Sequence, residues 1–275
     1  MTTEPRIAVI IPAAGSSARF NQGNPDAILA PRNKLDEDLG GRPVLQRTIE
    51  LFNTRHDVTA VIVAGPADDD AFGQFEFKHG DKIALLGATL CRGGKADRYE
   101  TVRNALEHLP DDATHIAVHD AARPITPPAL IDRLFDLAKT HPAVIPAIDC
   151  PDTIKRVNPE PVPDTPIDPA AAILGLGADA GDSNLRRVEQ TLDRSSLVLV
   201  QTPQIFERDL LIRAYAQDDL ASTDDAGLIE RLGEPVITTP GDPANIKITR
   251  PADIPVARAL GGFRPPAERA SHKKF

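Results

Sequence analysis

The segment that most constrains this chain is I-A-V-I-I-P-A-A-G-S-S-A-R, at residues 7–19. Its run of mostly β-branched apolar residues shows no polar alternation, which predicts a strand buried on both faces of a parallel sheet. Pro12 ends the strand because it has no N–H group to donate. Small residues follow and allow backbone N–H groups to approach a ligand closely: Ala13, Ala14, Gly15, Ser16, Ser17 and Ala18. With Arg19 as a cation after them, the segment is typical of a site for nucleotide phosphates at the carboxyl end of a strand.

The same segment also suits an ordinary turn between a strand and a helix, so it does not identify a nucleotide site by itself. It does not match the P-loop pattern G-x-x-x-x-G-K-[ST], nor the complete dinucleotide pattern G-x-G-x-x-G. Neither a P-loop enzyme nor a standard dinucleotide-binding protein is therefore supported.

Strand and helix patterns alternate along most of the chain. Apolar runs of strand length recur at residues 58–64, 88–91, 114–119, 143–148, 197–200, 235–239 and 245–249. Segments with helical character lie at residues 45–52, 68–79, 95–109, 130–138, 207–217 and 251–260. Phe72, Phe75 and Phe77 are expected to be the core contacts of the second of these helices. The alternation predicts an α/β fold with a doubly wound, mostly parallel sheet of Rossmann-like type, which binds ligands along its carboxyl edge.

One insertion interrupts this alternation. A short strand, D-T-I-K-R-V at residues 152–157, follows another strand directly, and residues 158–183 are rich in Pro, Asp, Ala and Gly without a period. We interpret residues 152–196 as a β-arm that projects from a single domain of residues 1–260. Residues 261–275 are expected to form a flexible tail. The long loop before Lys34 is rich in Asn, Gly and Pro, which suits a lid.

The composition limits the class of partner and the compartment. The net charge of −9 argues against a protein that binds nucleic acids or membrane surfaces in general. Cys91 and Cys150 are too few for a disulfide framework and are expected to be small buried residues. We see no signal segment and no apolar stretch long enough to cross a bilayer, so a cytoplasmic protein is expected.

Five charged residues stand at predicted strand ends or in the first loops: Arg19, Lys34, Asp120, Arg123 and Lys247. Each one alone would suit a solvated surface charge, so the argument depends on their joint placement. One carboxylate beside several cations suits a magnesium-bound triphosphate, because Mg²⁺ needs only one or two protein carboxylates besides phosphate oxygens. The cations would stabilise the charge that shifts when an α-phosphate is attacked.

The pattern H-x-x-x-H-D, formed by His115, His119 and Asp120, raises the alternative of a metal-dependent hydrolase. The two histidines fall on a predicted strand rather than a helix, and no second acidic cluster completes a two-metal site. His119 is therefore expected to be a packed residue at the strand end.

Seven sequence blocks occur in the order known from one enzyme family. They are P-A-A-G-S-S-A-R (12–19), R-Y-E-T-V-R-N-A-L (98–106), H-D-A-A-R-P (119–124), D-T-I-K (152–155), Q-T-P-Q-I-F (201–206), T-D-D-A (223–226) and N-I-K-I-T-R-P (245–251). Through these blocks, residues 7–260 resemble the bacterial and plastid 2-C-methyl-D-erythritol 4-phosphate cytidylyltransferases of the non-mevalonate isoprenoid pathway.

The resemblance implies a reaction that joins CTP and methylerythritol phosphate with release of pyrophosphate. It implies catalytic cations at Arg19, Lys34 and Lys247, and a magnesium ligand at Asp120. It implies nucleotide-binding positions at Ala13, Ala14, Gly15, Gly94 and Thr101, where the hydroxyl of Thr101 replaces the serine usual in the family. Binding of the phosphorylated acceptor is implied for Asp120, Arg123, Thr153, Arg194, Thr202, Thr223 and Lys247. The family also implies a homodimer that exchanges its arms.

Two alternatives remain open from the sequence. The same blocks overlap with enzymes that use a pentitol phosphate such as ribitol 5-phosphate as the acceptor. A nucleotide-binding regulator without catalysis would be expected to lose Arg19, Lys34, Asp120 or Lys247, and all four are present. A comparison of acceptors distinguishes the first alternative from the proposed substrate.

Overall fold

The structure is a computed structural model that describes residues 4–22, 31–162 and 185–264. It divides into two compact units, of which the larger contains Met1–Ile148 with Val200–Phe275 and the smaller contains Asp149–Leu199. Most of the loop before Lys34, most of the irregular part of the expected arm, and residues 265–275 of the expected tail lie outside the described residues.

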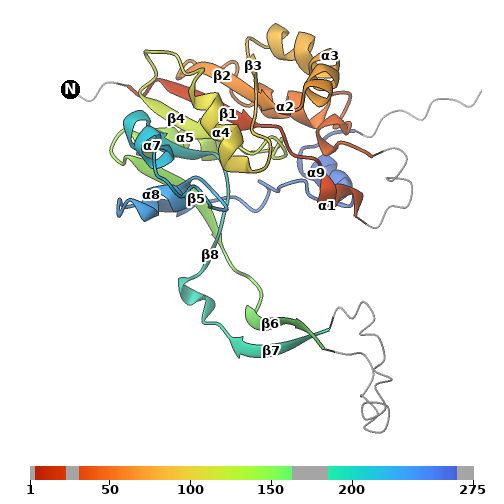
Figure 1. The fold of residues 1–275 in the computed structure, drawn as a ribbon, viewed down its shortest axis with the longest axis vertical. Coiled ribbons are helices and arrows are strands. Elements are labelled where there is room, and N and C mark those ends of the chain that lie inside the picture. The colour runs from red at the N-terminus through yellow and green to blue at the C-terminus, as the bar shows by residue number, and fades with distance from the viewer. Residues whose placement is uncertain (1–3, 23–30, 163–184, 265–275) are drawn as a thin grey trace, which may run out of the picture. The chain divides into compact units, whose positions relative to one another are not determined.

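The larger unit is built on a twisted sheet (Figure 1). Its strands lie in the spatial order β10 (Ile237–Pro240), β5 (Ala143–Asp149), β9 (Gln204–Glu207), β4 (His115–Val118), β1 (Ile7–Pro12), β2 (Val58–Gly65) and β3 (Thr89–Arg92), and β8 (Val198–Val200) also pairs with β5. Strand β9 runs antiparallel to both of its neighbours, whereas the other pairings along this path are parallel. The prediction of a mostly parallel α/β sheet is confirmed.

Helices cover both faces of the sheet because successive side chains of a strand point to opposite faces. Ile7, Val9 and Ile11 pack in one apolar cluster with helices α2 (Val44–Glu50), α3 (Asp69–Leu85), α5 (Pro128–Ala138) and α9 (Asp253–Leu260). Ile10 packs in a second cluster with α4 (Arg98–Leu106), α7 (Arg208–Tyr215) and α8 (Ala226–Arg231). Strand β1 is thus buried on both faces, as its unbroken apolar run predicts.

The direction of winding reverses between β1 and β4. Strand β1 pairs in parallel with β2 on one side and with β4 on the other. The carboxyl ends of β1 and β4 therefore lie side by side, and the N–H of His119 donates to the carbonyl of Ile10 at 2.9 Å. In doubly wound sheets the crevice at such a switch point is where ligands bind.

Residues 245–249 form no strand, which corrects the prediction made from their alternating pattern. Asn245 is buried, its Nδ2 donates to the carbonyl of Thr202 at 2.9 Å, and its Oδ1 accepts from the Thr126 hydroxyl at 2.8 Å. Side-chain hydrogen bonds of this buried asparagine hold the segment as a loop across the end of the sheet.

Other elements also differ from the predictions. Strand β9 was not predicted, α3 continues to Leu85, and α4 spans only Arg98–Leu106 of the predicted 95–109. Phe75 is buried but Phe77 is 94% exposed, because two positions along a helix turn the side chain to the far side. The first strand of the arm begins at Lys155 rather than at residue 152.

The smaller unit is an antiparallel pair of strands, β6 (Lys155–Pro161) and β7 (Arg186–Thr191), followed by the short 3-10 helix η3 (Arg194–Ser196). Its apolar side chains Val188, Leu197, Val198 and Leu199 are exposed. A two-stranded pair of this kind has little apolar area to bury within itself.

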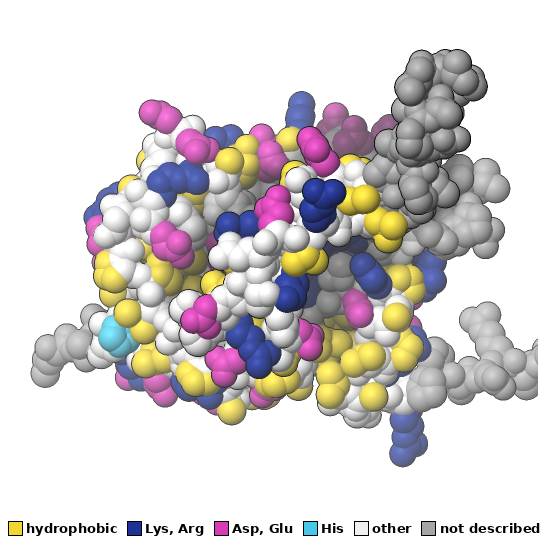
Figure 2. Space-filling model, turned by 90° about the horizontal axis from the view of Figure 1, so that it is seen from below, with side chains coloured by type: hydrophobic (Ala, Val, Ile, Leu, Met, Phe, Trp, Pro, Cys, Tyr) yellow, Lys and Arg dark blue, Asp and Glu magenta, His cyan; other side chains and the backbone are white. Residues whose placement is uncertain are grey.

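The surface carries charges of both signs. On the face in Figure 2, Lys and Arg side chains are interspersed with Asp and Glu side chains, so this face has no continuous positive stripe. None of the helices in the described part of the chain is long and apolar enough to cross a membrane.

Candidate active site

The loop after β1 brings two of the predicted cations to the same side of the switch point. Ser17 has a left-handed backbone conformation with φ 58°, which turns the chain into the short helix α1 (Ala18–Asn21) that carries Arg19. The Ser17 hydroxyl donates to Asn33 Oδ1 at 3.2 Å and accepts from the N–H of Lys34 at 3.3 Å. This contact ties α1 to the 3-10 helix η2 (Lys34–Asp36), so Arg19 and Lys34 lie close together.

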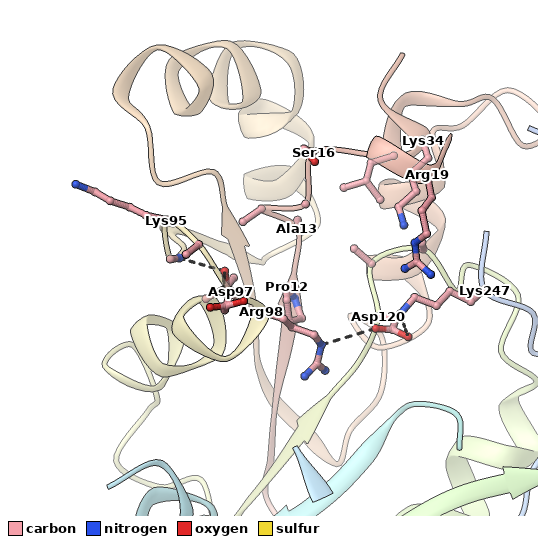
Figure 3. A pocket seen from close by; sticks show the side chains of 18 residues that line it. Pro12, Ala13, Ser16, Arg19, Lys34, Lys95, Asp97, Arg98, Asp120 and Lys247 are labelled. Carbon is pink, nitrogen blue, oxygen red and sulfur yellow. Dashed lines mark hydrogen bonds and ion pairs between the residues drawn. The ribbon is translucent and has the colours of Figure 1, made fainter. Parts of the chain in front are cut away.

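A pocket of about 370 Å³ opens above the carboxyl ends of β1 and β4. In Figure 3 the charged ends of Arg19, Lys34 and Lys247 point toward Asp120, whereas the Lys95 side chain points away. Nine of the predicted catalytic and binding residues line this pocket: Ala13, Ala14, Gly15, Arg19, Lys34, Gly94, Thr101, Asp120 and Lys247.

A second pocket of about 340 Å³ also has Asp120 in its lining. Its lining includes the predicted acceptor-binding residues Asp120, Arg123, Thr202, Thr223 and Lys247. Asp120 and Lys247 therefore line both pockets, as does Arg98. Two sites that share a wall of charged groups suit a reaction between two bound molecules.

Asp120 is the charged centre of this wall. Its Oδ2 lies 3.0 Å from Lys247 Nζ and 3.1 Å from Arg123 Nε, and its N–H donates to the Thr202 hydroxyl at 3.0 Å. Burial alone would raise the pKa of the carboxyl group, but the positive charges of Lys247, Arg98 and Arg123 outweigh it and hold the pKa well below 3.8. Asp120 is therefore ionised at neutral pH.

The loop after β3 brings a backbone edge up to the first pocket. A side chain at Gly94 would meet Glu100 Cβ at 2.1 Å and the Thr101 nitrogen at 2.8 Å, so this position requires glycine. The N–H of Gly94 donates to the buried Thr101 hydroxyl at 3.1 Å. Thr101 thus shapes this loop with its hydroxyl.

His119 is a packed strand-end residue, as expected. It is fully buried, its Nε2 lies 3.1 Å from the Arg123 carbonyl, and its Nδ1 lies 3.2 Å from the Thr202 hydroxyl. Burial lowers its pKa to about 4, so the ring is neutral at pH 7. Among the described residues there is no group of three or more His, Cys, Asp or Glu side chains placed to hold a metal ion. Cys91 and Cys150 are buried and free, as expected.

Two of the predicted residues are not brought into these pockets. Thr153 and Arg194 are exposed and belong to the smaller unit. Sequence reasoning also gave no role to Arg98, although it begins a recognised block. Its contacts depend on Asp225, a residue far along the chain, so the block alone does not reveal them.

The surroundings of Lys34 lower the pKa of its ammonium group. Burial lowers its pKa from 10.5, and the positive charges of Lys247 and Arg19 lower it further against the opposing effect of Asp120. Because the charged form exists below the pKa, we expect turnover to fall on the alkaline side at a lower pH than for an ordinary lysine. Initial rates between pH 7 and 11 test this, and Lys34→Arg should move the decline to higher pH. An unchanged alkaline limb in that variant would assign the decline to another group.

The fold and these pockets define the class of protein: an α/β enzyme with a doubly wound sheet and two pockets that share charged residues at its switch point. The family model described as 2-C-methyl-D-erythritol 4-phosphate cytidylyltransferase matches residues 7–168 and 178–261. This chain belongs to that family.

Individual relatives agree with the family match. The protein of that name from Frankia casuarinae is 41% identical over 268 residues, covering 97% of this chain and 85% of the relative. The one from Rhodococcus jostii is 37% identical over 255 residues, covering 92% and 94%. The crystal structure of the Thermus thermophilus enzyme of this name superposes with a TM-score of 0.64 at 29% identity, covering 94% of this chain and 100% of that one.

Proposed function

We propose that this protein transfers CMP from CTP to 2-C-methyl-D-erythritol 4-phosphate, which forms 4-diphosphocytidyl-2-C-methyl-D-erythritol and pyrophosphate. The observation that carries the proposal is the convergence of Arg19, Lys34 and Lys247 on Asp120, at the wall between two pockets. Membership of the cytidylyltransferase family supports the choice of both substrates. Because Cys91 and Cys150 are free thiols, a reducing cytoplasm suits the protein.

The reaction assigns one pocket to each substrate. CTP would occupy the first pocket, with its base and ribose against the loops of Ala13 to Gly15 and Gly94 and its α-phosphate near Arg19, Lys34 and Lys247. The acceptor would occupy the second pocket, held by Arg123, Thr202 and Thr223. A phosphate oxygen of the acceptor attacks the α-phosphorus, and the bond to the bridging oxygen of the β-phosphate breaks. Pyrophosphate leaves with that electron pair, while fixed cations stabilise the charge.

The residues present fit a magnesium ion as the cofactor. Asp120 Oδ2 is held by Lys247 and Arg123, whereas Oδ1 lies 4.0 Å from Arg98 Nε, its nearest ion-pair partner in the described structure. One carboxylate oxygen directed to a phosphate site is the donor set that Mg²⁺ uses together with substrate phosphates and water. When bound, the ion would neutralise phosphate charge.

Thr153 and Arg194 are proposed to hold the acceptor of a partner subunit through exchanged arms. The exposure of Val188, Leu197, Val198 and Leu199 in the smaller unit supports a partner, because a second copy would bury these side chains. Sedimentation velocity should give the mass of a dimer, and Leu199→Asp should shift the protein toward the monomer. A monomeric wild type at micromolar concentration would contradict this assignment.

The activity is tested by pyrophosphate release from CTP and magnesium with three acceptor conditions: methylerythritol 4-phosphate, ribitol 5-phosphate, and none. We expect release only with the first. Release only with ribitol 5-phosphate would retain the mechanism and replace the substrate. Binding of CTP without release in any condition would favour the nucleotide-binding regulator.

A further inference from the structure

Arg98 lines both pockets, and the reaction proposed above assigns no role to it. It is the first residue of α4, it lines both pockets, and its guanidinium points toward Asp120 in Figure 3. Its Nε lies 4.0 Å from Asp120 Oδ1, on the opposite side of the carboxylate from Lys247 and Arg123, which contact Oδ2. Arg98 therefore faces the oxygen that would remain available for a ligand.

The other end of the Arg98 guanidinium is fixed by a buried carboxylate. Asp225 is 0% exposed, and its Oδ2 lies 2.7 Å from Arg98 Nη2. Its Oδ1 accepts a hydrogen bond from the Tyr215 hydroxyl at 2.5 Å. Burial opposes the charge of Arg98, but Asp225 and Asp120 outweigh it and raise the pKa of Arg98 above its usual value. The guanidinium is therefore charged at neutral pH.

The position of Asp225 is not explained by the helix it precedes. It stands at the N-cap of α8, yet its side chain makes no capping hydrogen bond. An ion pair with a buried carboxylate is often no more stabilising than apolar side chains of similar volume, because the buried charge loses its hydration. The carboxylate is directed at Arg98 instead, and its contact with Tyr215 leaves it little freedom to turn.

We propose that Arg98 is a positioning residue that fixes the orientation of the Asp120 carboxylate, and that Asp225 and Tyr215 hold Arg98 in place for this task. The inference rests on the proposed function, in which Asp120 binds magnesium beside the substrate phosphates. The rigid fork of arginine can contact Asp225 with one nitrogen while another faces Asp120, which the single ammonium of a lysine cannot do. The ion pair of Arg98 and Asp225 also connects two of the sequence blocks, the one that begins at Arg98 and T-D-D-A, which contains Asp225.

A double variant separates positioning from a purely structural role. In Arg98→Met with Asp225→Leu, both charges are replaced by apolar groups, so no buried charge is left without a partner. We expect the midpoint of thermal unfolding to fall by a few degrees, because the Tyr215 hydroxyl loses its acceptor. The affinity for CTP should stay near wild type, while kcat falls about 10–100-fold, as for other groups that orient a ligating side chain. Arg98→Lys alone should lose activity to a similar extent. Arg103→Met, at an exposed position of the same helix, is the matched control and should leave kcat unchanged.

A crystal structure of the double variant gives a readout that does not depend on turnover. We expect the Asp120 carboxylate to rotate from its wild-type orientation while Lys247 and Arg123 remain near it. A double variant with wild-type kcat, or with Asp120 unmoved, would overturn the inference. If wild type itself released no pyrophosphate, the proposed function would fail, but the orientation of Asp120 in the two structures would still decide the positioning role.

Discussion

Arg19→Ala should lower kcat for pyrophosphate release by about 10²–10³-fold, the loss typical of removing one preorganised group that stabilises a transition state. Arg19 lies beyond the carboxyl end of β1 and points into the first pocket toward Asp120. In the proposed reaction its positive charge stabilises the α-phosphate, where negative charge redistributes as the bond to pyrophosphate breaks. The side chain is exposed, so its loss should leave the free energy of unfolding within about 0.5 kcal/mol of wild type.

The matched control is Arg6→Ala. Arg6 stands directly before β1, at the opposite end of the strand from Arg19, where it pairs with Asp112. The Arg6→Ala substitution removes the same charge from the protein as Arg19→Ala, so any effect of net charge on the binding of CTP appears in both variants. Equal kcat values for the two variants would remove Arg19 from the catalytic set. A higher KM with unchanged kcat would reduce its role to ground-state binding.

The sequence predicted the centre of the fold well because the signal there is local. The unbroken apolar run of β1 can be satisfied only between two layers of helices, and residues 7–11 are indeed fully buried. Since a parallel sheet places strand ends at one edge, the residues that follow β1 and β4 had to meet there. The sequence alone therefore predicts that Arg19 and Asp120 belong to one site.

The predictions from the sequence were wrong where a segment is held by side chains distant along the chain instead of by the backbone hydrogen bonds of a sheet. The alternating pattern of residues 245–249 is typical of a strand, but the buried Asn245 binds Thr202 and Thr126 and holds a loop instead. Arg98 is a similar case, since its partner Asp225 belongs to another helix. Such pairings are properties of the tertiary structure, and periodicity within a segment does not contain them.

Asp120→Asn should abolish most turnover, by about 10²–10³-fold or more, because it removes the one carboxylate that both pockets share with Lys247. Asparagine keeps the shape of the side chain but cannot balance the charges at 3.0 Å and 3.1 Å, which belong to Lys247 and Arg123. Without magnesium, CTP should bind the variant at least as tightly as wild type, because a negative charge near the phosphates is gone. Titration calorimetry measures this. Weaker binding of CTP without metal would show that Asp120 acts on the nucleotide in another way.

The same substitution changes how stability depends on pH. The folded-state pKa of Asp120 lies well below 3.8, so the carboxylate stabilises the wild type above that pH, and this contribution is lost as the pH falls toward the folded-state value. We therefore expect wild type to lose more stability than Asp120→Asn between pH 5 and pH 3, with unfolding followed by urea titration at each pH. Asp112→Asn, at the exposed pair with Arg6, is the control and should follow the wild-type curve closely. Parallel curves for wild type and Asp120→Asn would mean that the cations around Asp120 do not hold its charge in the folded protein.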